Sequence, residues 1–140
     1  FNFQQAGLLV YGDDDNYVRL AHVSIFETRQ TEFGKEYVDE TRGPLFGSTL
    51  AGPPSLWTYL RIVKRINMRT NEEVYTPYTS RDGISWVRGG AWTHDLGTNA
   101  KIGLFAMGKQ NADDQSYTAD FDYVRVNAVF NETYMPLVFK

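Results

Sequence analysis

The sequence predicts an all-β domain, an antiparallel two-sheet sandwich or a barrel. Roughly six to eight short segments alternate in the manner of strands and are separated by turn residues. An Asp-Gly pair and an Asp/Asn cluster lie between strand-like runs, as they do in β-hairpins. No segment shows a sustained 3.6-residue apolar period, which favours an all-β class.

The first expected element is a hairpin. Residues 6–11 are a short apolar run, and residues 17–23 read as the returning strand. Residues 13–16 between them are Asp and Asn, which hydrogen-bond to their own backbone and favour turns. On the returning strand Val18 and Leu20 fall on one face, which we expect to be the core face.

The next stretch is less regular. Residues 24–36 predict a short strand followed by a polar connection. Residues 40–56 contain three prolines and three glycines, which favours a long surface loop. A strand is expected over residues 57–66, with Leu60 and Ile62 on its core face.

The second half of the chain predicts one more hairpin and two final strands. Residues 73–80 and 84–88 flank an Asp-Gly pair, which is a strong hairpin signal. Further strands are expected over residues 101–107 and 118–126. The tail, residues 127–140, is so apolar that we expect it to dock on the body or on a neighbouring surface.

Length and composition narrow the function classes. A chain of 140 residues predicts one domain. A net charge of −3 argues against a nucleic-acid partner, and no apolar run approaches the ~20 residues of a membrane span. The absence of cysteine excludes disulfides, thiolate nucleophiles and Cys-based zinc sites. The chain opens on Phe1 without a signal peptide, so we expect a processed or excised piece.

Four motifs in order resemble one family. Residues 5–11 (QAGLLVY) and 13–20 (DDDNYVRL) resemble the first hairpin of a concanavalin A-like (LamG/jelly-roll) family. That family includes the C-terminal β-sandwich of family 43 glycoside hydrolases of the β-xylosidase type, and related secreted bacterial domains of unknown function. The further matches are residues 59–65 (YLRIVKR), 78–86 (YTSRDGISW), and 102–106 with 119–126 (IGLFA and ADFDYVRV).

The resemblance implies a concanavalin A-like jelly roll over residues 1–126, followed by the tail of residues 127–140. Family members have one or two strands before the QAGLLVY segment, whereas only four residues precede it here. Either the chain has been cut, or a strand edge is left exposed or filled by another segment. We therefore expect strand pairing or self-association at the N-terminal edge.

The resemblance also implies a function. It points to a non-catalytic, carbohydrate-binding accessory module of a secreted bacterial glycoside hydrolase or related extracellular protein. Its partner would be a polysaccharide or a catalytic domain of the same polypeptide. The alternative is a purely structural or adhesive interaction domain with no sugar affinity, because fold alone does not fix function.

A glycosidase in its own right is the least favoured class. Concanavalin-like glucanases carry a Glu-x-Asp-x-x-Glu strand that places acid and nucleophile on one face. Here Asp120 and Asp122 share a strand face, but no third acid follows them. Neither His22 nor His94 accompanies a recognisable nucleophile. We therefore expect no catalytic residues in this domain.

Sugar binding needs flat aromatic faces together with polar partners for hydroxyl groups. Four aromatic residues in or near loops, and one arginine on the non-core face of its strand, meet that description. These candidates are Trp57, Trp92, Tyr37, Tyr17 and Arg61. The alternative is that the aromatics fill the core, which we expect of Phe105, Phe121 and Trp86.

Calcium is the one metal that the sequence suggests. Asp13, Asp14, Asp15 and Asn16 are hard oxygen donors in one turn, and Asp113-Asp114 is a second acidic pair. The alternative is a solvated turn of like charges. No other cofactor is expected, since the two histidines are far apart and have no neighbouring ligands.

Two further patterns favour structural roles. Ser80, Asp82 and Trp86 resemble a shortened Asp-box, in which Ser and Asp lock the turn and Trp packs beneath it. The basic residues Arg61, Lys64, Arg65 and Arg69 favour a solvated or ion-paired face.

Overall fold

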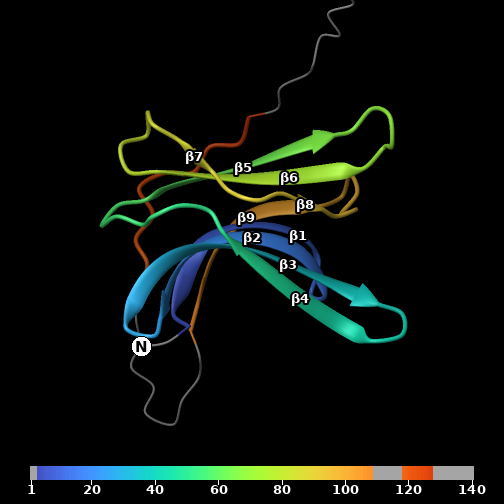
Figure 1. Cartoon of the computed structure of the whole chain (residues 1–140), viewed down its shortest axis with the longest axis horizontal. Coiled ribbons are helices and arrows are strands. Elements are labelled where there is room, and N and C mark those ends of the chain that lie inside the picture. The colour runs from blue at the N-terminus through green and yellow to red at the C-terminus, as the bar shows by residue number, and fades with distance from the viewer. Residues whose placement is uncertain (1–2, 109–117, 128–140) are drawn as a thin grey trace, which may run out of the picture.

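A computed structural model of the chain describes residues 3–108 and 118–127. These residues form strands without any helix, in two antiparallel sheets that face each other (Figure 1). The strands are β1 (Gln5–Asp13), β2 (Asn16–Ile25), β3 (Thr28–Asp39), β4 (Gly43–Leu50), β5 (Tyr59–Ile66), β6 (Glu73–Ser80), β7 (Val87–Arg88), β8 (Trp92–Thr93) and β9 (Lys101–Met107). The predicted all-β, two-sheet class is confirmed.

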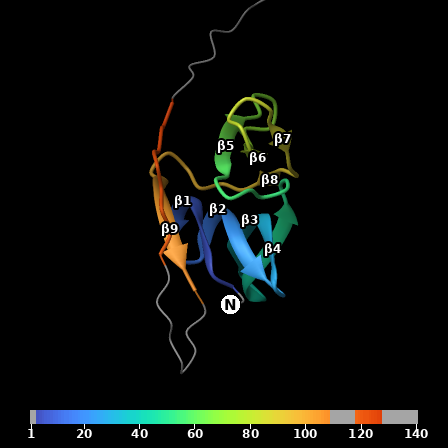
Figure 2. The ribbon, with the colours of Figure 1, turned by 90° about the vertical axis from the view of Figure 1, so that its left-hand side faces the viewer.

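The larger sheet has five strands in the order β4-β3-β2-β1-β9, all antiparallel. In the smaller sheet β6 pairs with β5 on one side and with the short strands β7 and β8 on the other. Figure 2 shows the two sheets as separate layers of a sandwich. The space between them therefore holds the core.

The core follows the predicted alternation of the strands. Its fully buried members come from both sheets and include Val18 and Leu20 of β2. Leu60 and Ile62 of β5 pack against them, so the expected core faces of both strands are confirmed. The other members are Val10, Phe33, Ala51 and Tyr75, with Trp92, Leu96 and Ala100 packed on them.

The hairpin of β1 and β2 is confirmed, but the two stretches that follow it differ from expectation. The polar connection within residues 24–36 is wrong, because β3 runs from Thr28 to Asp39. The long loop of residues 40–56 is also wrong over Gly43–Leu50, which is β4. The prolines and glycines of this stretch are tolerated because β4, which among the described strands pairs only with β3, is an edge strand.

The second hairpin is confirmed as a turn, although its return strand is short. Gly83 has φ +74°, a left-handed conformation that suits glycine in such a turn. Only Val87–Arg88 of the expected strand over residues 84–88 is paired. The expected strand over residues 118–126 is wrong, since residues 118–127 carry no strand pairing.

The expected N-terminal edge is not an edge. β1 lies between β2 and β9, so β4 and β9 are the edges of the larger sheet as far as the chain is described. Of the aromatics expected in the core, Phe121 is 41% exposed, and Phe105 and Trp86 are half-buried outside the core cluster. The pair Asp113-Asp114 and almost all of the tail lie outside the described residues.

Candidate functional site: a polar cleft between the sheets

A cleft of about 410 Å³ opens between the two sheets at one end of the molecule. Figure 1 places the β5–β6 turn and the segment after β8 at this end, facing β3. The lining residues come from these three segments and are all polar. They are Lys35, Thr70, Asn71, Glu72, Glu73, Thr93, His94 and Asp95.

Lys35 fastens the larger sheet to the smaller one. It lies on the core face of β3, two residues after Phe33, and its Nζ donates a hydrogen bond to the Thr93 carbonyl at 2.6 Å. The ammonium also lies 4.7 Å from the ring centroid of Tyr37. Burial lowers the pKa of Lys35. The side chain is therefore held in place at the inner end of the cleft.

Glu73 organises the opposite wall and is committed to it. Its carboxylate accepts hydrogen bonds from Lys64 at 2.6 Å, the Tyr75 hydroxyl at 2.7 Å and the Leu96 N–H at 3.0 Å. Burial alone would raise the pKa of Glu73, but these hydrogen bonds outweigh it and lower the pKa. Such a carboxylate stays ionised and has a structural role.

His94 is held between the sheets. Its backbone N–H donates to the Glu73 carbonyl at 3.1 Å, and its Nε2 lies 2.9 Å from the Glu36 carbonyl oxygen. A carbonyl only accepts, so Nε2 carries a proton and Nδ1 of the neutral ring is an acceptor. Burial, and then the charge of Lys35, lower the pKa of His94. The ring also meets Tyr37 edge-on, with centroids 6.5 Å apart.

The outer part of the cleft has hydrogen-bonding groups that the fold leaves available. Asn71 is exposed on the β5–β6 turn, where its φ of 59° is left-handed. Glu72 accepts one hydrogen bond, from the Thr70 hydroxyl at 2.7 Å, and Asp95 is exposed. Amide, hydroxyl and carboxylate groups around one space can both donate to and accept from a hydroxyl-rich ligand.

None of the five predicted sugar-binding residues lines this cleft, but two of them, Tyr37 and Trp92, are neighbours of lining residues. Tyr37 is 36% exposed and contacts Lys35 and His94, as described. Trp92 precedes the lining residue Thr93, but its indole is half-buried against the core. The indole Nε1 donates to the Phe33 carbonyl at 3.1 Å. Tyr37 is therefore available to a ligand, whereas Trp92 mainly supports the wall.

The other three predicted residues lie elsewhere. Trp57 is 56% exposed in the connection before β5. Tyr17 lies on the outer face of the larger sheet, where its hydroxyl donates to Glu36 at 2.9 Å. Arg61 is exposed on the outer face of β5, and its guanidinium carbon lies 3.7 Å from the ring centroid of Trp86. The five residues therefore do not form one site.

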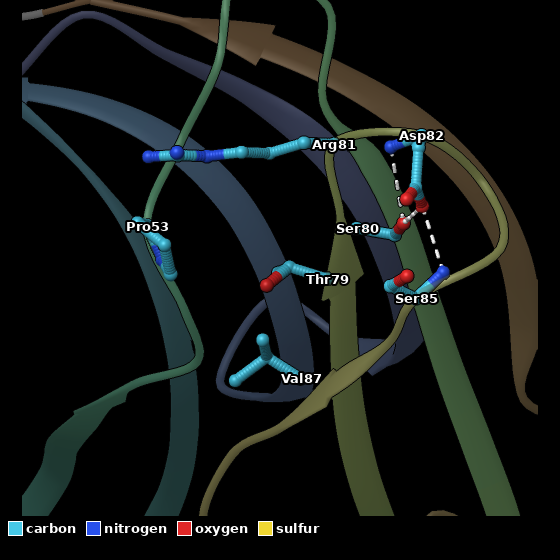
Figure 3. A pocket seen from close by; sticks show the side chains of 7 residues that line it. All are labelled: Pro53, Thr79, Ser80, Arg81, Asp82, Ser85 and Val87. Atoms are coloured by element: carbon cyan, nitrogen blue, oxygen red, sulfur yellow. Dashed lines mark hydrogen bonds between the residues drawn. The ribbon is translucent and has the colours of Figure 1, made fainter.

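A second, smaller pocket of about 220 Å³ adjoins the Asp-box-like turn. Figure 3 shows the hydrogen bonds that join Asp82 to Ser80 and to Ser85 on one side of it. Asp82 Oδ1 accepts from the Ser80 hydroxyl at 2.8 Å and from the N–H groups of Ile84 and Ser85 at 2.8 and 2.7 Å. These groups lock the turn, as predicted, so the polar cleft is the better candidate for a binding site.

The predicted calcium turn uses its donors internally. Asp13 Oδ1 accepts from the Asp15 N–H at 3.0 Å and from the Asn16 side chain at 2.8 Å, and Asp14 accepts from the Tyr11 hydroxyl at 2.6 Å. Within residues 3–108 and 118–127, no three His, Cys, Asp or Glu side chains gather where they could hold a metal. Calcium binding by this turn stays a prediction.

Sequence reasoning missed most of the cleft. Lys35, His94 and the acids of the β5–β6 turn have no motif of their own, and only the fold brings them together. A signal was present for Lys35, because Thr31, Phe33 and Lys35 alternate along one face of β3. That signal becomes visible only when residues 28–39 are recognised as a strand.

Comparison with known proteins adds no relative: no family model, curated protein or solved structure matches the chain. In the described part of the chain no helix is long and apolar enough to cross a membrane. The case for a function therefore depends on the residues of this chain.

Proposed function

We propose that the chain is a concanavalin A-like jelly-roll sandwich that binds a glycan without catalysis, as an accessory module of a secreted glycoside hydrolase or related extracellular protein. The polar cleft is the proposed binding site. One observation carries the proposal: a cleft of about 410 Å³ is lined only by polar side chains, beside the exposed ring of Tyr37. This combination suits a sugar better than an apolar ligand.

The chemistry of the lining supports a hydroxyl-rich ligand. Sugar hydroxyls both donate and accept, and Asn71, Glu72 and Asp95 offer both functions at the mouth. Lys35 and His94 are fixed by their contacts with the opposite sheet, so little side-chain entropy is lost when a ligand arrives. The ring of Tyr37 supplies an apolar face for sugar C–H groups.

A second candidate function, a structural or adhesive module, is favoured by a different observation. Several apolar side chains of β9 and residues 118–127 are exposed, among them Ile102 at 57% and Phe121 at 41%. Exposed apolar patches commonly mark surfaces that pack on another protein. A catalytic domain of the same polypeptide is the partner that the family resemblance suggests.

Affinity gel electrophoresis in xylan, arabinan or β-glucan tests the proposal. We expect retardation by at least one of them, and a roughly tenfold weaker affinity for Tyr37→Ala and for the pair Asn71→Gly with Glu72→Gln. Glycine keeps the left-handed backbone at position 71 while removing the amide. Tyr123→Ala, at a tyrosine 62% exposed away from the cleft, is the matched control.

Two results would contradict the proposal. If no polysaccharide retards the folded protein, the structural or adhesive candidate takes its place. If aryl glycosides are turned over, the module is an enzyme and the non-catalytic assignment fails.

A further inference from the structure

The outer face of the smaller sheet gathers arginines and aromatic rings. The strand register places Arg61 of β5, Tyr78 of β6 and Arg88 of β7 in one row across the sheet. Leu60, Ile62 and Tyr75 of the same strands turn to the core, so this row faces away from it. Neighbouring strands lie about 4.8 Å apart, which separates the backbones of Arg61 and Arg88 by about 10 Å.

Trp86 fixes the direction of Arg61. The alternation of side chains puts Trp86 on the same face as Arg88, and the Arg61 guanidinium carbon lies 3.7 Å from its ring centroid. An arginine stacked on an aromatic ring keeps its N–H donors in a plane, directed outward from the ring edge. The stack therefore prepares Arg61 for a planar acceptor and lowers the entropy lost on binding.

Among the described residues, the two arginines of this face have no ion-pair partner. Neither Arg61 nor Arg88 forms an ion pair within residues 3–108 and 118–127, and both are exposed. Lys64, by contrast, turns to Glu73 on the core side of β5. Arg61 and Arg88 are therefore unpaired cations on one face, although the net charge of the chain is −3.

We infer that this face binds a carboxylate-bearing polysaccharide of the uronic acid class, through Arg61 and Arg88. A carboxylate takes two parallel hydrogen bonds from one guanidinium, and two arginines about 10 Å apart can hold separate carboxylates of one polymer. The inference rests on the proposed function for its choice of a glycan, but it uses another surface than the cleft. A nucleic acid is the other polyanion that these arginines could bind, and the test below includes it.

The test compares polygalacturonate with its methyl ester, which has the same backbone and no charge. We expect the folded protein to bind polygalacturonate and not the ester, with an affinity that falls as salt is added. Arg61→Gln and Arg88→Gln should each weaken binding about tenfold, by isothermal titration calorimetry. Arg61→Lys should also weaken it, since lysine keeps the charge but loses the planar fork.

Arg42→Gln is the matched control, because it makes the same charge change in the exposed β3–β4 turn. Equal losses for Arg42→Gln and Arg61→Gln would overturn the inference, as would unchanged binding by Arg61→Gln. Tighter binding of single-stranded nucleic acid through the same arginines would also overturn it. Thermal melts of each variant verify that it is folded.

The cleft variant Tyr37→Ala separates this inference from the proposed function. If it loses neutral glycans while polygalacturonate still requires Arg61, both hold. If neutral glycans require Tyr37 but no variant affects polygalacturonate, only the inference fails. If polygalacturonate requires Arg61 and no neutral glycan binds, the inference holds and the cleft proposal fails.

Discussion

His94 is a residue of the cleft whose protonation state depends on its surroundings. Its ring lies between the Glu36 carbonyl, Lys35 and Tyr37. The negative charges of Glu73 and Asp95 act on the ring, and the ring in turn acts on Asp13. Burial and Lys35 lower its pKa, while the hydrogen bond to Glu36 and the carboxylates oppose that change. The neutral ring is therefore the form that the folded protein favours.

The first prediction is that the free energy of unfolding falls on acidification through this histidine. The pKa of His94 is below its ordinary 6.5 in the folded protein, so below pH 6.5 the unfolded chain binds more protons. The contribution of neutral His94 to the free energy of unfolding is fully present above pH 6.5, and it is lost as the pH falls through the pKa of the folded protein. Urea unfolding at pH values on both sides of 6.5 measures it.

His94→Gln should reduce this pH dependence, because glutamine does not titrate. His22 is the internal comparison, because burial and then the charge of Arg29 lower its pKa too. His22→Gln should remove only the part of the pH dependence of stability that His22 causes. A pH dependence that is identical in the wild type and in His94→Gln would show that the ring does not control it.

At the scale of elements, the β2–β3 turn explains why one hairpin could not be read from the sequence. Its two central residues, Phe26 and Glu27, have φ values of 48° and 62°. Hairpins of this kind usually carry Asn or Gly there, because left-handed backbone is unfavourable for other residues. Without those residues the sequence of the turn gives no hairpin signal, and the strand that follows it resembles a polar connection.

The second prediction follows from this strain. Glu27→Gly should raise the free energy of unfolding by about 1 kcal/mol, because glycine adopts the left-handed backbone without steric cost. Glu27→Ala is the control: it removes the same side chain but keeps the strain, and it should leave stability close to that of the wild type. Chemical denaturation measures both, and a glycine variant no more stable than the alanine variant would contradict the argument.

Turns that are specified by their own residues could be predicted from the sequence, whereas strands that depend on pairing with a neighbouring strand could not. Asp82 and Gly83 specify their turn through their own hydrogen bonds and backbone, so the sequence identified it. β4 depends on its register with β3 instead, and its proline and glycines resemble a loop when read alone. The cleft was missed for the same reason, since its walls come from three separate segments.

At the scale of the molecule, the distribution of charge matters more than its sum. The net charge of −3 is compatible with a face where Arg61 and Arg88 stand without acids, and with acids gathered at the cleft and at the β1–β2 turn. The aromatic residues are likewise divided, so that Tyr75 fills the core while Trp86 supports an arginine outside it. Composition alone could not separate these surfaces.

The third prediction concerns the open edge of the larger sheet. β9 pairs only with β1 in the described residues, and the smaller sheet leaves Ile102 and Leu104 of β9 exposed on the side that faces it. An apolar strand at a sheet edge is a template for pairing with another chain. We therefore expect the isolated chain to self-associate through β9, rather than through the N-terminal strand as the sequence suggested.

Sedimentation velocity over a range of protein concentrations tests this expectation. Ile102→Lys places a charge on the edge strand and should weaken self-association about tenfold, because a buried unpaired charge opposes pairing. Ile84→Lys, at an isoleucine 83% exposed in the turn before β7, is the matched control and should leave association unchanged. A wild-type chain that stays monomeric throughout, or equal effects of the two lysines, would exclude β9 as the contact. Because Ile102 and Ile84 are 57% and 83% exposed in the monomer, each lysine should change the stability of the monomer little, so that a change in association reports on the contact at β9.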